Sequence, residues 1–208
     1  RIQMANESCD RRIRKSKAAL KESLLALMEQ KNFEDISITD IVRAAELNRG
    51  TFYKHYQVKE ELLNELLDDV AAEFIEAYRA PYRNKQTFEV KHLTASAITL
   101  YDHVQRNARF YTLLVMRNAF GGFQNRICGI LKNLYLEDVT DMSPSPKIDQ
   151  ELLAGFRAHA VFGLIAEWVK GGFKYSSTYM AEQTLEIIRK NQENDAYATN
   201  LSRTEITR

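Results

Sequence analysis

The sequence predicts an all-α fold of about nine helices, and three observations lead to this prediction. Apolar residues recur at i, i+3 and i+4 in nearly every segment, which is the period of an amphipathic helix. No segment alternates apolar and polar residues in the manner of a half-buried strand. The 208 residues include only 8 glycines and 3 prolines, too few for a turn-rich β-sandwich.

The first helix is expected over about residues 10–31, because Ile13, Leu20 and Leu24 share one face. Residues 1–59 carry 12 Lys and Arg against 8 Asp and Glu, whereas residues 60–208 carry 17 against 20. Six of the basic residues lie close together in this helix: Arg11, Arg12, Arg14, Lys15, Lys17 and Lys21. A basic end on a mildly acidic body indicates docking on a polyanion, although a solvated helix face explains the charges equally well.

Two short helices follow, over about residues 38–46 and 49–56. Ser37 or Thr39 is the expected N-cap of the first, and Asp40, three residues after Ser37, is able to complete a capping box with it. Asn48 is the expected N-cap of the second. Two short helices joined by a tight turn make a helix-turn-helix, so residues 1–60 are predicted to form a small three-helix domain.

Residues 61–208 are predicted to form a larger helical domain. A long helix begins at Lys59 and ends before Pro81, and the polar residues from about 193 are expected to be a loose tail. Between them, helices are expected at about 86–106, 110–120, 123–134, 150–170 and 179–192. The pairs Gly121-Gly122 and Gly171-Gly172 are expected to end two of these helices, and residues 138–149 to form a loop.

The helix at 49–56 has the face that a reader of the DNA major groove needs. Phe52 and Tyr56 fall on one side and face the core, while Gly50 and Lys54 lie opposite. Arg49 is able to form a bidentate pair with guanine, and Thr51 to contact bases or a thymine methyl group. Phosphate contacts are expected from Thr39, Tyr53, His55 and Lys59. The alternative is a packing motif that does not bind DNA.

These residues resemble the TetR family of bacterial transcriptional regulators. The resemblance is carried by Ile38-Thr39-Asp40-Ile41-Val42-Arg43-Ala44-Ala45, by Asn48-Arg49-Gly50-Thr51-Phe52-Tyr53-Lys54-His55-Tyr56 and by Lys59-Glu60-Glu61-Leu62-Leu63. It covers about residues 10–70. The segment Trp168-Val169-Lys170-Gly171-Gly172-Phe173, with Met180-Ala181 after it, resembles the C-terminal domain of Firmicutes members.

The resemblance implies a homodimer with two DNA-binding heads on a pseudo-palindromic, double-stranded operator, and a small-molecule effector in the C-terminal domain. The expected DNA-binding residues are Thr39, Asn48, Arg49, Gly50, Thr51, Tyr53, Lys54, His55 and Lys59. Position 54 varies within the family, so Lys54 is expected to contribute specificity together with Arg49 and Thr51. A repressor is the first reading of the function. The alternative is an adaptor or coactivator that acts through a protein partner.

The effector pocket and the dimer interface are placed from the apolar residues of the later helices. An apolar or amphipathic ligand would be lined by Tyr101, His103, Phe110, Met116, Phe120, Phe123, Phe156, His159 and Trp168, unless these residues are simply core. The helix at 150–170 is apolar on more than one face. It is either buried in one chain or packed in a dimer through Phe156, Phe162, Ile165, Val169, Leu185 and Ile188.

Other classes of protein find no support in the sequence. It contains no G-x-S-x-G, P-loop, G-x-G-x-x-G or H-E-x-x-H motif, so no enzyme activity and no cofactor is expected. Two cysteines, Cys9 and Cys128, are too few for a disulfide framework, and no zinc-binding C-x-x-C is present. The charged residue Glu167 interrupts the apolar stretch Ala160–Ala166, and Arg1–Arg14 lacks the apolar core of a secretory signal. A cytoplasmic protein without a membrane span is therefore expected.

Overall fold

The computed structural model describes residues 2–83, 92–138 and 145–190, with the side chains of residues 2–9 left out. Within these ranges the chain forms nine α-helices and no strand, as the sequence predicts. The predicted polar tail from about residue 193, the start of the predicted 86–106 helix and residues 139–144 of the predicted loop lie outside the described residues.

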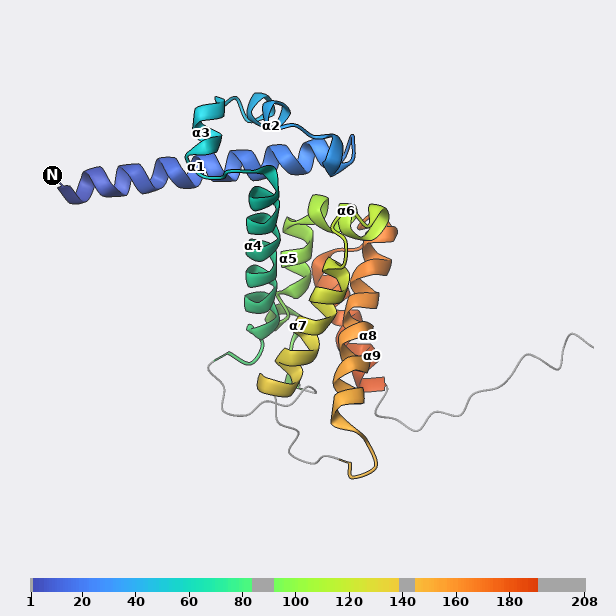
Figure 1. Cartoon of the computed structure of the whole chain (residues 1–208). Coiled ribbons are helices and arrows are strands. Elements are labelled where there is room, and N and C mark those ends of the chain that lie inside the picture. Colours follow the sequence, from blue (N-terminus) through green and yellow to red (C-terminus); the bar gives the residue numbers. More distant parts are fainter. Residues whose placement is uncertain (1, 84–91, 139–144, 191–208) are drawn as a thin grey trace, which may run out of the picture.

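The N-terminal helices form a small unit, which we call the head. It comprises α1 (Ile2–Met28), the short 3-10 helix η1 (Phe33–Asp35), α2 (Ile38–Ala44) and α3 (Arg49–Tyr53). In Figure 1, α1 lies across the end of the molecule, with α2 and α3 on one side of it and the other helices on the opposite side. Leu20, Leu24, Ile41 and Phe52 are fully buried, so one apolar core holds the three helices together.

Both predicted N-caps of the head are confirmed. The Ser37 hydroxyl accepts a hydrogen bond from the Asp40 backbone N–H at 3.1 Å, and the Asp40 carboxylate accepts one from the Ser37 N–H at 3.0 Å. The Asn48 side-chain oxygen accepts a hydrogen bond from the Thr51 N–H at 2.8 Å. These caps satisfy backbone donors that the first turn of a helix otherwise leaves free, so the short helices can start where they do.

The remaining helices form the body. These are α4 (Lys59–Arg79), α5 (Leu100–Arg106), α6 (Ala108–Arg117), α7 (Phe123–Asp138), α8 (Gln150–Lys170) and α9 (Ser177–Lys190). Helix α4 leads away from the head, and the others gather beside it (Figure 1). The α7 helix packs along α8, and α5 packs between α4 and α9. Helix α6 reaches both α8 and α1, so the body contacts the head through α4 and α6.

The structure corrects the bounds of three predicted helices, and the first of these is α1, which begins at Ile2 rather than at about residue 10. The helix predicted at 86–106 begins only at Leu100, after a 3-10 turn at Ala95–Ala97, because Ile98 is not helical and Thr99 donates its hydroxyl hydrogen to the Ala77 carbonyl. The helix predicted at 110–120 ends at Arg117 rather than at Gly121-Gly122. Asn118 adopts the left-handed conformation (φ 48°) and the Ala119 N–H donates back to the Leu113 carbonyl.

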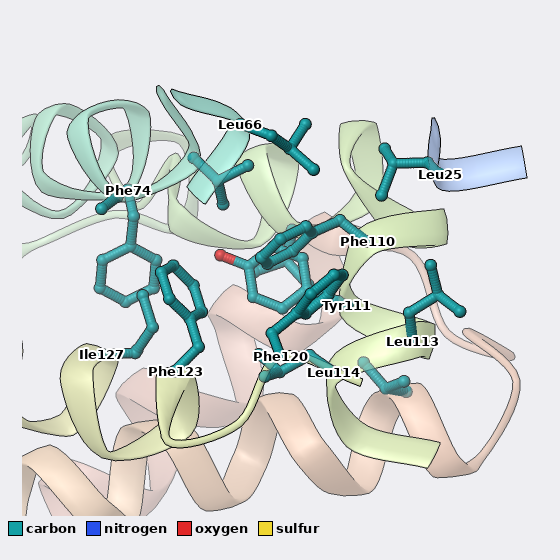
Figure 2. Packing of buried hydrophobic residues seen from close by; sticks show 14 of the residues in the cluster. Leu25, Leu66, Phe74, Phe110, Tyr111, Leu113, Leu114, Phe120, Phe123 and Ile127 are labelled. Atoms are coloured by element: carbon teal, nitrogen blue, oxygen red, sulfur yellow. The ribbon is translucent and has the colours of Figure 1, made fainter. Parts of the chain in front are cut away.

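The body is held together by aromatic residues (Figure 2). Phe110 stacks on Phe120 with ring centroids 4.6 Å apart and meets Phe123 edge-on at 5.4 Å. Both arrangements are favoured geometries for aromatic pairs. Leu25 of α1 points toward the same cluster, so the core of the head continues into that of the body.

Helix α8 has an apolar face that the described residues of the chain do not cover. Its inner side buries Ala158, Phe162 and Ile165, whereas Leu152 and Phe156 on its outer side are 75% and 68% exposed. By length and composition this helix could cross a membrane, with a mean hydropathy of 1.3 over an 18-residue window that is 33% buried. A core helix that packs a second face against another protein chain has the same composition.

Candidate DNA-binding surface

Helix α3 presents the outward face that the sequence predicts. Phe52 and Tyr56 are buried beneath it, with exposed fractions of 0% and 4%. Gly50, Tyr53 and Lys54 are exposed, and Thr51 is half-buried. The apolar side of α3 is therefore fixed to the core, and small, hydroxyl-bearing and basic groups face solvent.

The N-terminus of α3 is built tightly around Asn48. Its side-chain oxygen accepts hydrogen bonds from both the backbone N–H and the hydroxyl of Thr51, at 2.8 and 3.1 Å. A methyl group at position 50 would approach that oxygen to 3.2 Å, so Gly50 leaves room for the cap as well as for a ligand. Asn48 thus has a structural role in the free protein, and a base contact by its amide stays a prediction.

Arg49 is held above the surface by its neighbours. Its guanidinium donates a hydrogen bond to the Tyr53 hydroxyl at 3.1 Å and lies 3.5 Å from the Thr39 hydroxyl. The same group lies 5.8 Å from the centre of the Tyr53 ring, within the range of a cation–π contact. Thr39, Arg49 and Tyr53 therefore converge from α2 and α3 on one exposed site with hydrogen-bond donors.

Lys59 makes contacts in the free protein that the sequence does not predict. Its ammonium group donates to the carbonyl oxygens of Phe33, Glu34 and Ile36 at 2.8, 3.0 and 2.9 Å. An ammonium group has three hydrogens to donate, and all three are used here. Lys59 therefore ties the start of α4 to the η1 turn, and its contact with a DNA phosphate stays a prediction.

His55 and Lys54 lie at the end of α3. Partial burial, together with the positive charges of Lys17 and Lys54, lowers the pKa of His55 from its ordinary value. The imidazole is therefore neutral at pH 7 and has one N–H to donate. Lys54 is exposed, with its ammonium group in no ion pair among the described residues.

A cluster of ion pairs, which we call the clasp, joins α1 to α4 beneath this surface. Lys17 and Lys21 both contact Glu65, at 2.9 and 2.7 Å, and Lys21 also reaches Asp69 at 2.5 Å. Burial acts to raise the pKa of Glu65, but the hydrogen bonds from Lys21 and Lys17 outweigh it and lower the pKa to about 2. Sequence analysis missed this cluster because its two halves lie more than 40 positions apart.

The predicted effector-pocket residues separate into two groups. The prediction is wrong for Met116, Phe156 and His159, because their side chains are exposed and line no interior space. The other six are buried and contact one another or their neighbours, namely Tyr101, His103, Phe110, Phe120, Phe123 and Trp168. For these residues, binding of a ligand stays a prediction.

Polar groups in this interior are paired with one another. The Tyr101 hydroxyl lies 2.6 Å from that of Thr184, and the His103 Nε2 lies 3.0 Å from the Tyr111 hydroxyl. Burial, reinforced by the charge of Arg106, lowers the pKa of His103 to about 4. Among the described residues, no group of three or more His, Cys, Asp or Glu side chains is placed to hold a metal ion.

The predicted dimer interface is also divided by the structure. Four of its residues lie inside the core of the chain itself, so the prediction is wrong for Phe162, Ile165, Val169 and Leu185. Phe156 and Ile188 are exposed, and the sequence missed three exposed apolar neighbours of theirs: Leu152, Tyr179 and Ile187. Helical period alone did not determine which face of α8 turns inward, because both faces are apolar.

The head and its exposed α3 face define a helix-turn-helix DNA-binding protein. Two family models match the chain. Residues 22–66 match the bacterial regulatory proteins of the tetR family, and residues 91–190 match a transcriptional regulator C-terminal region. The chain belongs to the TetR family of DNA-binding transcriptional regulators. Family and fold are those of regulators rather than enzymes.

Curated relatives match at low identity or over short stretches. An uncharacterized HTH-type transcriptional regulator of Bacillus subtilis, YxbF, is 19% identical over 183 residues, covering 85% of this chain and 46% of that protein. The dhaKLM operon transcriptional activator DhaS of Lactococcus lactis is 39% identical over 49 residues, covering 24% of this chain and 26% of that protein. The chain thus spans less than half the length of these curated relatives.

Solved structures share the fold. The dihydroxyacetone kinase operon activator DhaS has a TM-score of 0.60 at 20% identity, covering 85% of this chain and 95% of that one. A TetR-family regulator from Syntrophomonas wolfei has a TM-score of 0.61 at 16% identity, covering 89% of this chain and 99% of that one. At these identities the likeness concerns the fold alone.

Proposed function

We propose that this chain is a cytoplasmic repressor that binds a pseudo-palindromic operator as a homodimer and is released by a small-molecule effector. The observation that carries the proposal is the convergence of Arg49, Tyr53 and Thr39 on the exposed side of a helix whose other side is buried. In the complex, the two α3 helices of the dimer would enter major grooves about 34–36 Å apart or somewhat further.

The contacts divide into base readout and phosphate binding. Arg49 and Thr51 would read bases, with Lys54 adding specificity at the end of α3. Thr39, Tyr53 and His55 would bind phosphates beside the groove. Because the Arg49 guanidinium is already held by Tyr53, little side-chain freedom would be lost when it meets guanine.

The test is an in-vitro selection of random duplex DNA on the purified protein, followed by salt-dependent affinity measurements on the selected sequence. A palindromic sequence bound with a steep salt dependence is expected. The Arg49→Ala variant should lose about 1–3 kcal/mol of binding free energy and relax the base preference. Weak binding that ignores sequence would contradict the proposal, and an unchanged base preference in Arg49→Ala would contradict the role of that residue.

The homodimer is supported by the uncovered apolar face of α8 and α9. Leu152, Phe156 and Ile187 are exposed there, and Tyr175 stacks on Tyr179 at the start of α9. An exposed apolar patch of this kind commonly marks a protein–protein contact. A second copy would cover it with the same residues, because a two-fold dimer uses one patch twice.

Trp168 offers a way to detect the binding of an effector. Trp168 is the one tryptophan of the chain, and it is buried against Tyr101 at 5.7 Å and Phe173 at 5.0 Å. A ligand that enters this interior should therefore change its fluorescence and lower operator affinity together. The expected ligand is small and apolar or amphipathic.

An adaptor or coactivator that works through a protein partner is the second candidate. The dense contacts among the buried aromatic residues favour it, because they leave the predicted pocket residues packed on each other. Fold likeness to an operon activator is compatible with it. In-vitro transcription from a promoter carrying the selected operator separates the candidates, because a repressor lowers the transcript and an activator raises it.

A further inference from the structure

The first half of α1 extends beyond the other helices of the head. Its first buried side chain is Leu20, and all the described side chains of residues 10–15 are exposed, including that of Ile13 at 39%. Figure 1 shows this part of α1 running past α3 on the side where the chain begins. At a rise of 1.5 Å per residue, residues 2–15 extend over roughly 21 Å of helix.

Basic residues dominate this part of the helix. Four exposed cations lie in residues 10–15, which we call the basic segment: Arg11, Arg12, Arg14 and Lys15. In the described part of the chain, none of the four takes part in an ion pair. Lys17 and Lys21, one and two turns further on, are in contrast held by Glu65 and Asp69 in the clasp. The chain therefore neutralises its basic residues where α1 meets α4 and leaves those of the basic segment available.

The basic segment is unfavourable to the helix that carries it. Arg11 repels Arg14 at i+3 and Lys15 at i+4, and Arg12 repels Lys15 at i+3, each pair by about 0.2–0.5 kcal/mol, whereas Asp10 offsets only one such term by attracting Arg14 at i+4. Among the described side chains of α1, no buried contact offsets this repulsion, because burial begins only at Leu20. Structural stability therefore does not account for the four cations, whereas a polyanionic ligand would turn their repulsion into attraction.

We propose that the basic segment binds the sugar-phosphate backbone of the operator duplex, outside the base pairs that α3 reads. The proposal rests on the proposed function, since it extends the same DNA-binding surface along α1. Duplex DNA is the occupant that the structure favours because α3 and the basic segment are neighbouring parts of one head (Figure 1). The six residues of the basic segment extend over roughly 9 Å of helix, which is about three base pairs at a rise of 3.4 Å.

The experiment uses the full chain and duplexes that hold the selected operator with flanks of increasing length. Two double variants, Arg12→Gln with Lys15→Gln and Arg11→Gln with Arg14→Gln, remove the charges from different sides of the helix. Glutamine keeps a similar helix propensity. The matched control, Arg106→Gln with Lys147→Gln, removes the same charge from exposed positions outside the head.

Wild-type affinity should rise roughly tenfold as each flank grows to about three base pairs and then level off. At least one double variant should lose this gain and reduce the salt slope of the dimer by up to about four, because it removes two charges from each of the two heads, while the control behaves as the wild type. Base preference should stay unchanged in all three, because phosphate contacts carry no sequence information.

Three results would overturn the inference, and they are distinguishable. If the wild type selects an operator but its affinity ignores flank length, or if both double variants match the control, the inference fails and the proposed function stands. If no sequence-selective binding occurs at all, both fail. Tighter binding to vesicles of phosphatidylserine and phosphatidylcholine than to flanked DNA, lost in the same variants, would assign the segment to a lipid surface instead.

Discussion

At the scale of single residues, Lys59 has a structural role that the sequence does not predict. A lysine after a helix-turn-helix is well placed for a phosphate, and the sequence offers no sign of another use. The structure places the carbonyls of Phe33, Glu34 and Ile36 around its ammonium group. Only the three-dimensional path of the η1 turn brings these acceptors together, so no local pattern could have predicted them.

Lys59→Met should therefore destabilise the protein rather than only weaken DNA binding. We expect the free energy of unfolding to fall by about 2 kcal/mol, because three carbonyls lose charge-assisted hydrogen bonds. Urea denaturation measures this loss. Lys54→Met is the matched control, since Lys54 is exposed, and its stability should change by less than about 0.5 kcal/mol while its salt slope on DNA decreases. If the stability of Lys59→Met is unchanged and its salt slope on DNA is reduced, Lys59 acts through a direct phosphate contact and not through the η1 turn.

His103 makes the stability of the body depend on pH. Its pKa is about 4 in the folded protein, against an ordinary value of 6.5. Between these values the unfolded chain binds a proton that the folded chain does not, so acidification favours unfolding. The effect of His103 on the free energy of unfolding is zero above pH 6.5 and grows to a loss of about 3 kcal/mol near pH 4. Glu73 approaches Nδ1 to 3.5 Å but is 60% exposed, so water screens most of its opposing effect.

The measurement is urea denaturation at pH 7.5 and pH 5, compared between the wild type and His103→Gln. Glutamine retains a polar group that can reach the Tyr111 hydroxyl but does not titrate. The wild type should lose about 2 kcal/mol more than the variant between these two pH values. Parallel losses in the two proteins would mean that His103 is not the group responsible.

At the scale of elements, helix bounds were predicted well where a local side-chain or backbone signal sets them. Ser37 and Asn48 cap α2 and α3 as expected, because a capping side chain acts on a backbone donor only three residues away. Gly171-Gly172 ends α8 for a similarly local reason, with Gly172 at φ 67°. The end of α6 was predicted at the glycine pair, because glycine adopts the left-handed region most readily. Asparagine also tolerates this region, and Asn118 ends the helix there.

Asn118 provides a test of that conformation. Alanine tolerates a positive φ poorly, so Asn118→Ala should lower the free energy of unfolding by about 1 kcal/mol. Asn118→Gly keeps the backbone unstrained and should stay within about 0.5 kcal/mol of the wild type. Denaturation of the two variants side by side separates backbone strain from loss of the asparagine side chain. Equal loss in both would contradict the role assigned to the left-handed conformation.

At the scale of the whole molecule, two connections join the DNA-binding head to the body. The clasp holds α1 to α4, and Arg109 of α6 pairs with Glu22 and Glu29 of α1. The Arg117 guanidinium donates to the Met28 carbonyl at 3.2 Å, on the same side of the head. A movement of α6 would therefore also move α1, and the movement of α1 would shift the surface that is proposed to bind DNA. Sequence periodicity predicted these helices but not their partners, because ion pairs between distant segments leave no local pattern.

In the proposed homodimer, the outer face of α8 forms part of the contact between the two chains, so it determines whether the molecule carries one DNA-binding head or two. Phe156 lies near the middle of this face and is 68% exposed, so a charge placed there should not disturb the fold of a single chain. In the proposed dimer the same position would be buried twice, and Phe156→Lys would bring two like charges into one interface. We expect the dimer dissociation constant to rise by roughly a hundredfold or more, since buried aromatic residues dominate such interfaces.

Light scattering after size exclusion, at micromolar protein, measures this change as a fall in mass from two chains to one. Met116→Lys is the matched control, because Met116 is also exposed and apolar but lies on α6. The far-ultraviolet circular dichroism of both variants should match the wild type. Phe156→Lys should also lose the preference for a palindrome, since one head reads only half of the operator. If its mass remains that of two chains, the dimer uses another face, and the exposed residues of α8 and α9 need a different partner.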